Sequence, residues 1–209
     1  MSAQLTWSHY CELLSIKDIN EINYYINISI KQNLSKRQLR EKIKSKEYQR
    51  LDDNTKLKLI NKEETVVSDF IKNPIVIKNK YNIDKEEVTE KILKKLILED
   101  LDNFLKELGT GFSYIENEYK IKIGNTYNYI DLLLFNYIYN CFVIIELKVT
   151  ELKKEHIGQI QIYMNYVDKN IKTINQDKTI GVIISKKDNG YYIEYSSDNR
   201  IFSKNYILS

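Results

Sequence analysis

The sequence is poor in the residues that build several common functional sites. Of its 209 residues, six are glycine, one is proline, two are cysteine and two are histidine. No glycine stands in a GxxxxGK[ST] or GxGxxG pattern, so neither a P-loop nor a dinucleotide-binding phosphate cradle is expected. Cys11 and Cys141 are far apart and form no CxxC pair, which leaves no framework for a structural zinc site. Two cysteines that form no motif are typical of a protein from a reducing compartment.

Two further absences concern membranes. The opening residues, MSAQLTWSHYCELL, contain no basic segment followed by an apolar run, so no secretory signal is expected. No stretch approaches the roughly 18 apolar residues that a membrane span requires. We therefore expect a cytoplasmic protein with no membrane contact. With 43% hydrophobic and 29% charged residues, the composition is typical of one globular domain or two small ones.

What is present begins with a local excess of positive charge. The net charge is only +3, but residues 31–58 contain ten basic and four acidic residues. A local basic surface attracts phosphate backbones. We expect DNA contacts from this segment through Lys36, Arg37, Arg40 and Lys44. A solvated helix of mixed charge is the open alternative.

Apolar residues at helical spacing predict three helices in the first part of the chain, around residues 7–14, 19–30 and 35–45. Ser35 is placed to cap the third. Two helices joined by a short polar turn, with the later one basic, are compatible with a helix-turn-helix. The predicted domains are a helical DNA-binding or interaction region, 1–70, and a second domain, 71–209, with a soft boundary inside 60–86.

The second part combines helices with strands. One amphipathic helix is predicted over 92–108 and ends at Gly109 and Gly111. Alternating or continuous apolar runs predict strands, of which the first three are consecutive and antiparallel. The predicted ranges are 119–123, 126–135, 141–149, 179–185 and 191–195 for strands and 154–168 for a further helix.

One buried strand ends in charged residues. CFVII (141–145) runs directly into Glu146 and Lys148, which share one face of the strand. The preceding strand carries Asp131 inside the apolar run YIDLLLF, and a hairpin would place it close to Glu146. Buried charges are unfavourable unless they pair or hold a metal. Two carboxylates that bind Mg²⁺, with a lysine that orients water or stabilises developing charge, suit phosphodiester hydrolysis.

A purely structural interpretation of these residues stays open. The E-x-K pattern also occurs at Glu118–Lys120 and Glu151–Lys153, so an ordinary ion pair at a strand end is the alternative. Only the copy at residues 146–148 follows a long buried strand and has an aspartate on the strand before it.

The helix predicted after this strand presents His156, Gln159 and Tyr163 on one face. We expect this polar face to look toward the sheet edge that carries Glu146. For His156, a solvated position at the helix N-terminus is the more ordinary interpretation. No GxSxG pattern exists, so a Ser/His/Asp triad is not supported.

Longer stretches carry a resemblance to a known family. YIDLLLFNYIYNCFVIIELK (129–148) and HIGQIQIYMNY (156–166) resemble the PD-(D/E)xK nuclease superfamily, and more narrowly its YhcG-like branch. SAQLTWSHY (2–10), NLSKRQLREKI (33–43) and FLKELGTGF (104–112) are similar to the same branch. The resemblance implies an α/β, restriction-endonuclease-like core, in which a mixed β-sheet is flanked by helices. A small helical, winged-helix-like N-terminal region would precede this core in the sequence. It also implies an endonuclease that cuts DNA with Mg²⁺ or Mn²⁺.

The resemblance further implies roles for single residues. Asp131 is the motif aspartate, Glu146 and Lys148 are the (D/E)xK pair, and Gln159 is the glutamine on the following helix. Asp131 and Glu146 would hold the divalent metal.

Two departures from the family pattern keep alternatives open. Relatives often carry an acidic residue on the first core helix, where this chain has Lys94, with Glu90 one turn away. This favours, as an alternative, a nuclease scaffold that binds DNA without cutting it. Relatives also usually have another helical segment before the WSH region, so a fragment and a shortened gene product are both open. A third interpretation makes residues 1–60 a protein-interaction domain, and a homo-oligomer is equally open.

Overall fold

The structure is a computed structural model that describes residues 5–187 and 190–209. The chain divides into two compact units, Met1–Thr65 and Val66–Ser209. Each unit is described by itself.

Four helices make up the described part of the first unit: α1 (Trp7–Leu13), α2 (Ile19–Lys31), α3 (Lys36–Lys44) and α4 (Asp53–Asn61). The three helices predicted there are confirmed. Ser35 caps α3 as predicted, since its hydroxyl accepts from the Gln38 N–H while the Gln38 side chain accepts from the Ser35 N–H at 2.8 Å. Helix α4, in the polar and charged segment that follows, was not predicted. Residues 5–65 contain no β-strand, so the described first unit has no wing.

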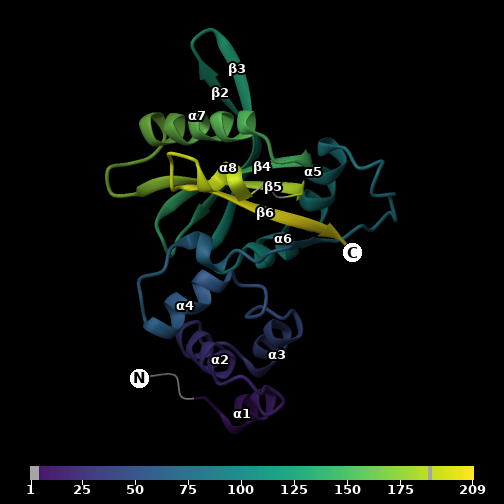
Figure 1. Ribbon diagram of the computed structural model, residues 1–209, viewed down its shortest axis with the longest axis vertical. Coiled ribbons are helices and arrows are strands. Elements are labelled where there is room, and N and C mark those ends of the chain that lie inside the picture. The colour runs from purple at the N-terminus through teal and green to yellow at the C-terminus, as the bar shows by residue number, and fades with distance from the viewer. Residues whose placement is uncertain (1–4, 188–189) are drawn as a thin grey trace. The chain divides into compact units, whose positions relative to one another are not determined.

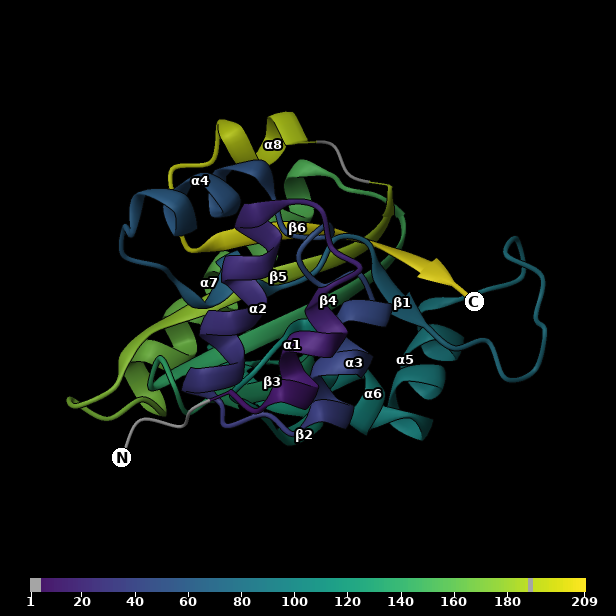
Figure 2. The same ribbon diagram turned by 90° about the horizontal axis from the view of Figure 1, so that it is seen from below.

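Tyrosine provides much of the core of the first unit. The rings of Tyr24 and Tyr25 lie 5.3 Å apart, and those of Tyr24 and Tyr48 lie 5.5 Å apart. Leu39 of α3 is fully buried, and α3 contacts both α1 and α2 (Figure 2). Aromatic pairs of this kind add packing energy beyond the area that they bury.

The second unit is built on a mixed six-stranded sheet with the strand order β1-β6-β5-β4-β3-β2 (Figure 1). Strands β1, β6, β5 and β4 run parallel, whereas β3 and β2 are added as antiparallel neighbours. The strands are β1 (Ile75–Ile77), β2 (Phe112–Ile123), β3 (Thr126–Asn136), β4 (Cys141–Glu151), β5 (Asp177–Lys187) and β6 (Ile201–Leu208). Together with the flanking helices, this mixed sheet confirms the predicted fold class.

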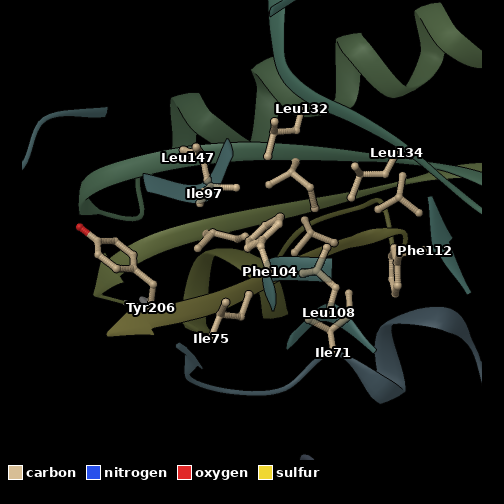
Figure 3. Packing of buried hydrophobic residues seen from close by; sticks show 14 of the residues in the cluster. Ile71, Ile75, Ile97, Phe104, Leu108, Phe112, Leu132, Leu134, Leu147 and Tyr206 are labelled. Atoms are coloured by element: carbon tan, nitrogen blue, oxygen red, sulfur yellow. The ribbon is translucent and has the colours of Figure 1, made fainter. Parts of the chain in front are cut away.

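Helices cover both faces of the sheet. On one face, α5 (Glu90–Glu99) and α6 (Leu101–Leu108) pack with the short helix η1 (Val67–Phe70) around a core that includes Phe104 and Leu132 (Figure 3). On the other, α7 (Lys154–Asn170) and α8 (Gly190–Glu194) pack against a second apolar cluster. No described helix has the length and apolar content that a bilayer crossing needs.

The central helix α7 lies very close to the sheet. A Cβ added at Gly181 of β5 would lie 2.7 Å from both Ile160 Cδ1 and Met164 Sδ of α7. Glycine at this position therefore allows α7 to pack this close to β5.

Two predicted elements are wrong in detail, and two strands, β1 and β6, were not predicted. The single helix predicted over 92–108 is two helices, because Asp100 has non-helical backbone angles (φ −134°, ψ 46°) and its carboxylate pairs with Lys78 at 3.1 Å. The strand predicted over 191–195 is largely helix α8, and Tyr195 is 81% exposed, so its alternating pattern does not reflect burial in a sheet. Strand β6, which takes the place beside β5, was not predicted.

Candidate active site

The β3–β4 hairpin brings Asp131 and Glu146 together. Leu132 pairs with Ile145, so the next position outward sets Asp131 beside Glu146. The Leu147 N–H donates to Asp131 Oδ2 at 3.0 Å, and the Asp131 N–H lies 3.5 Å from Glu146 Oε1. Each carboxylate is thus fixed by the backbone of the other strand. The predicted proximity of these two residues is confirmed.

Lys148 joins the same group two residues further along β4. Its Nζ lies 3.6 Å from Glu146 Oε2, and Glu146 is only 2% exposed. The same Nζ lies 3.6 Å from Oε2 of Glu90, the first residue of α5. Sequence reasoning named Glu90 without a motif to support it, and the structure places it against Lys148.

A second lysine approaches the site from α5. Lys94 Nζ lies 2.6 Å from Asp131 Oδ1 and 3.3 Å from Oε1 of Glu118 on β2. The side chains of Lys94 and Asp131 are each 15% exposed, so water screens this pair only partly. Glu118, which has a left-handed backbone (φ 50°), was noticed in the sequence only as part of another E-x-K pattern. Four acids therefore meet two lysines, Lys94 and Lys148, at this site; the acids are Asp131, Glu146, Glu90 and Glu118.

Burial and charge alter the acid–base properties of the group. Burial first, and then the negative charge of Asp131, raise the pKa of Glu146 to about 8, although Lys148 opposes this. Burial lowers the pKa of Lys94, but its ion pairs with Asp131 and Glu118 outweigh burial and leave that pKa above its ordinary value. Lys94 is thus a permanent cation beside Asp131 at neutral pH.

The polar face of α7 lies close enough to the site for the charge of Glu146 to alter the pKa of Tyr163. Burial is the main cause that raises the pKa of Tyr163, and the charge of Glu146 acts in the same direction. Gln159 Nε2 donates to the Tyr163 hydroxyl at 2.8 Å. His156 Nδ1 accepts from the Lys153 N–H at 3.1 Å, which is the helix-start position expected for it. Burial and Lys148 together lower the pKa of His156.

The donor set at the site suits one hard divalent cation. Mg²⁺ is commonly held by one or two carboxylates, with water and substrate phosphate completing its shell. Asp131 and Glu146 supply such carboxylates, although Lys94 already contacts one oxygen of Asp131. Within residues 5–187 and 190–209, no cluster of three or more His, Cys, Asp or Glu side chains is arranged to hold a metal. Asp131 and Glu146 are therefore the residues that would hold such an ion.

The basic residues predicted to contact DNA are mostly paired with acids. Nε and Nη2 of Arg40 donate to the two carboxylate oxygens of Glu12, at 2.9 and 2.7 Å, and Lys36 lies 3.5 Å from the same carboxylate. Hydrogen bonding from Arg40 is the main cause that lowers the pKa of Glu12 to about 2. Arg37 pairs with Glu41 at 3.1 Å, whereas Lys44 is exposed. Sequence reasoning missed Glu12, which lies outside the basic segment.

Two known protein families match parts of this sequence. The family described as "YhcG PDDEXK nuclease domain" matches residues 68–208. This chain belongs to the YhcG PDDEXK nuclease family. Its YhcG-type nuclease region begins two residues after the second unit starts at Val66, and it includes Asp131, Glu146 and Lys148. The family described as "DUF1016 N-terminal domain" matches residues 1–50.

Individual relatives agree with the YhcG assignment. The "Putative nuclease YhcG" of Escherichia coli (strain K12) is 26% identical over 189 residues, which cover 88% of this chain and 50% of that protein. The chain thus spans about half the length of the curated relative that it matches.

Solved structures are similar only at a distance. A repair endonuclease from Pyrococcus abyssi has a TM-score of 0.41 at 17% identity, covering 57% of this chain and 47% of that one. EndoMS in the structure titled "Structure of EndoMS-dsDNA2 complex" has a TM-score of 0.42 at 18% identity, covering 59% and 48%.

Proposed function

We propose that this protein is a metal-dependent DNA endonuclease that hydrolyses phosphodiester bonds. The observation that carries the proposal is the meeting of Asp131, Glu146 and Lys148 at adjoining positions of β3 and β4, inside the region that matches the nuclease family. Burying two carboxylates and an amine in a strand is unfavourable, and a reaction that uses all three accounts for their presence.

In the proposed reaction, each residue has a separate task. Asp131 and Glu146 would hold one Mg²⁺ or Mn²⁺, which neutralises phosphate charge and lowers the pKa of a bound water. Lys148 orients the attacking water or donates a hydrogen bond to a phosphate oxygen as negative charge develops there. Gln159, which donates a hydrogen bond to the Tyr163 hydroxyl on α7, is the fourth residue of the proposed catalytic site. Hydrolysis adds water across one P–O bond, which leaves a phosphate monoester and a hydroxyl group.

The direct test is cleavage of plasmid and oligonucleotide DNA with Mg²⁺ or Mn²⁺. We expect Asp131→Ala and Lys148→Ala to lose on the order of 100-fold or more in rate, as expected when a group that stabilises the transition state is removed. Lys153→Ala is the matched control, because it removes the lysine of an E-x-K pattern at an exposed position. Equal activity of wild type, Asp131→Ala and Lys148→Ala would remove the assignment.

We also propose that the N-terminal helical unit contacts DNA. The contacts would be Lys44, Arg37 released from Glu41, and Lys36 and Arg40 released from Glu12. Each neutralised phosphate contributes a slope of roughly −0.9 to the log–log dependence of affinity on salt. Lys44→Ala should therefore weaken binding and flatten that slope. Salt-independent association would instead support a protein-interaction role for this unit.

One observation favours a second candidate function, a nuclease fold that binds DNA without cutting. The ammonium of Lys94 takes an oxygen of Asp131 that a metal would need. Under this alternative, Mg²⁺ does not stabilise the folded chain at any concentration, and cleavage is absent. A metal-dependent rise in the unfolding temperature of wild type, lost in Asp131→Ala, rejects it.

A further inference from the structure

The tip of the β2–β3 hairpin forms a two-stranded arm, defined here as residues 119–130. Strand β3 pairs with β4 only from Leu132 onward, whereas β2 and β3 stay paired as far as Ile123 and Thr126. The arm therefore extends beyond the part of the sheet in which β4 pairs with β3. Figure 1 shows its tip extending past α7. An isolated two-stranded hairpin is only marginally stable, so something must hold this one in place.

The arm has two different faces. Ile121 and Ile130 are 1% and 0% exposed and belong to the apolar cluster that includes α7. The alternate positions point away from this cluster, because successive side chains on a strand face opposite ways. These positions are Lys120, Lys122, Tyr127 and Tyr129, all of them exposed. The buried face explains how the arm is held, and it leaves the other face free.

The exposed face is a patch of two lysines and two tyrosines. Lys120 lies directly opposite Tyr129, and Lys122 directly opposite Tyr127. Tyr127 and Tyr129 are 53% and 52% exposed, and Lys120 Nζ lies 3.9 Å from the centre of the Tyr127 ring. Residues 119–130 contain no acidic residue. Two exposed aromatic rings with cations beside them and no neutralising acid have no evident role in packing.

This patch adjoins the nuclease site along one strand. Tyr129 precedes Asp131 by two residues, and at about 3.3 Å per residue the arm reaches from about 7 Å to about 17 Å away from Asp131 along β3. The arm thus covers about 10 Å, the axial rise of about three nucleotides at 3.4 Å each, and its far end lies about five nucleotides from Asp131. A DNA strand that leaves the site in this direction would pass over the patch.

We propose that the arm binds single-stranded DNA next to the bond that is cut, with bases stacked on Tyr127 and Tyr129 and phosphates held by Lys120 and Lys122. The combination of a basic surface with exposed aromatic rings is the general means of holding an unpaired strand, because every base has a face that can stack. This inference rests on the proposed nuclease function and adds the class of substrate, DNA with an unpaired segment at the cleavage position.

The test uses the full chain with EDTA, so that binding is measured without cleavage. Fluorescence anisotropy would follow labelled oligo(dT) and a duplex of the same length. We expect Tyr129→Ala to weaken oligo(dT) binding by about 5- to 100-fold, the range for loss of one stacked base, and to affect the duplex less. Tyr129→Phe keeps the ring and should bind normally. Tyr137→Ala is the matched control, because Tyr137 is also exposed but follows the opposite end of β3.

The lysines are tested through salt dependence. Lys120→Ala/Lys122→Ala should reduce the log–log salt slope for oligo(dT) by roughly 1.4, at about 0.7 for each phosphate contact on a single strand. The control is Lys169→Ala/Lys178→Ala, two exposed lysines, of which Lys169 lies in the last turn of α7 and Lys178 at the start of β5. Unfolding temperatures of all variants identify any that fail to fold. If Tyr129→Ala fails to fold, the oligo(dT) affinities of Tyr129→Phe and Tyr129→Leu are compared instead.

Two outcomes overturn the inference: oligo(dT) affinity unchanged in Tyr127→Ala and Tyr129→Ala, or a loss as large in Tyr137→Ala. The outcome is separable from that of the proposed function. If the chain binds oligo(dT) through the arm but never cuts DNA, this inference stands and the proposed nuclease function is rejected. If the chain cuts DNA but substitutions in the arm do not change binding, the nuclease function stands and this inference is rejected.

Discussion

Lys94 Nζ lies 2.6 Å from Asp131 Oδ1, so the motif aspartate is already neutralised by a lysine from α5. The other oxygen of Asp131 accepts the Leu147 N–H. A divalent ion that binds Asp131 must therefore displace or share the Lys94 contact. A phosphate arriving with the substrate would give the displaced ammonium another anion to bind.

Replacing Lys94 with an uncharged residue should tighten metal binding. Lys94→Met removes the cation that competes for Asp131, and we expect the dissociation constant of Mg²⁺ or Ca²⁺ to fall about tenfold or more, equivalent to ~1.4 kcal/mol. Titration calorimetry without DNA measures this directly. Lys95→Met is the control, because Lys95 lies next in sequence but pairs with Glu99 at 3.8 Å. An affinity that is the same in all three proteins contradicts the competition.

The pKa of Glu146 predicts how stability depends on pH. That pKa is raised from 4.5 to about 8 in the folded chain, so the folded state binds a proton that the unfolded state has released between these values. The contribution of neutral Glu146 is full below pH 4.5 and is lost as pH rises through about 8. Stability should therefore fall across this window by as much as about 1.4 kcal/mol per pH unit.

Glu146→Gln should remove most of this pH dependence, since glutamine has no proton to release. Urea unfolding in EDTA at a series of pH values measures it. Glu151→Gln, at an exposed position of the same strand, should keep the wild-type slope. A fall in stability that persists unchanged in Glu146→Gln would show that another group is responsible.

A glycine at the interface of α7 with the sheet and a glycine on the exposed side of α7 should respond oppositely to alanine. Gly181→Ala should destabilise the fold by about 1–3 kcal/mol, because the new methyl group would lie 2.7 Å from Ile160 and Met164 side-chain atoms. Gly158→Ala, within α7, meets nothing within 4 Å and should stabilise by roughly 0.5–1 kcal/mol. Urea unfolding distinguishes them, and equal effects of the two changes would contradict the close contact at Gly181.

Glu12 should restrain any DNA binding by the first unit. Glu12→Gln removes the carboxylate that holds Arg40 and Lys36, so DNA affinity and the salt slope should both rise. Glu64→Gln removes the same charge from an exposed position and is the control. If Glu12→Gln binds DNA no more tightly than Glu64→Gln, the basic segment is a solvated helical face and not a DNA contact.

The residues of the site that lie on β3 and β4 could be predicted, because the sequence of the two strands and of the short turn between them is enough to place them together. Asp131, Glu146 and Lys148 stand out as charges inside apolar strands, and a short hairpin leaves little choice of register. Lys94, Glu90 and Glu118 come from separate elements. Their approach depends on how α5 packs on the sheet and on the irregular backbone at Glu118, which no spacing in the sequence reveals.

The errors in the fold have the same origin. Apolar spacing continues across Asp100, so periodicity alone joins α5 and α6, and only the backbone at that residue separates them. Tyr191–Tyr195 alternates like a strand, but a segment this short follows tertiary contacts more than its own pattern.

Strand β2 is twelve residues long and lies at the edge of the sheet, where an unprotected backbone invites a second molecule to add its own strand. Its register is interrupted between Tyr114 and Glu116, and Glu118 departs from extended geometry. Charged side chains at 116, 118, 120 and 122 line the same stretch. Irregular backbone and charge together disfavour edge-to-edge pairing with a second molecule. The surface that we propose for single-stranded DNA would therefore also discourage self-aggregation.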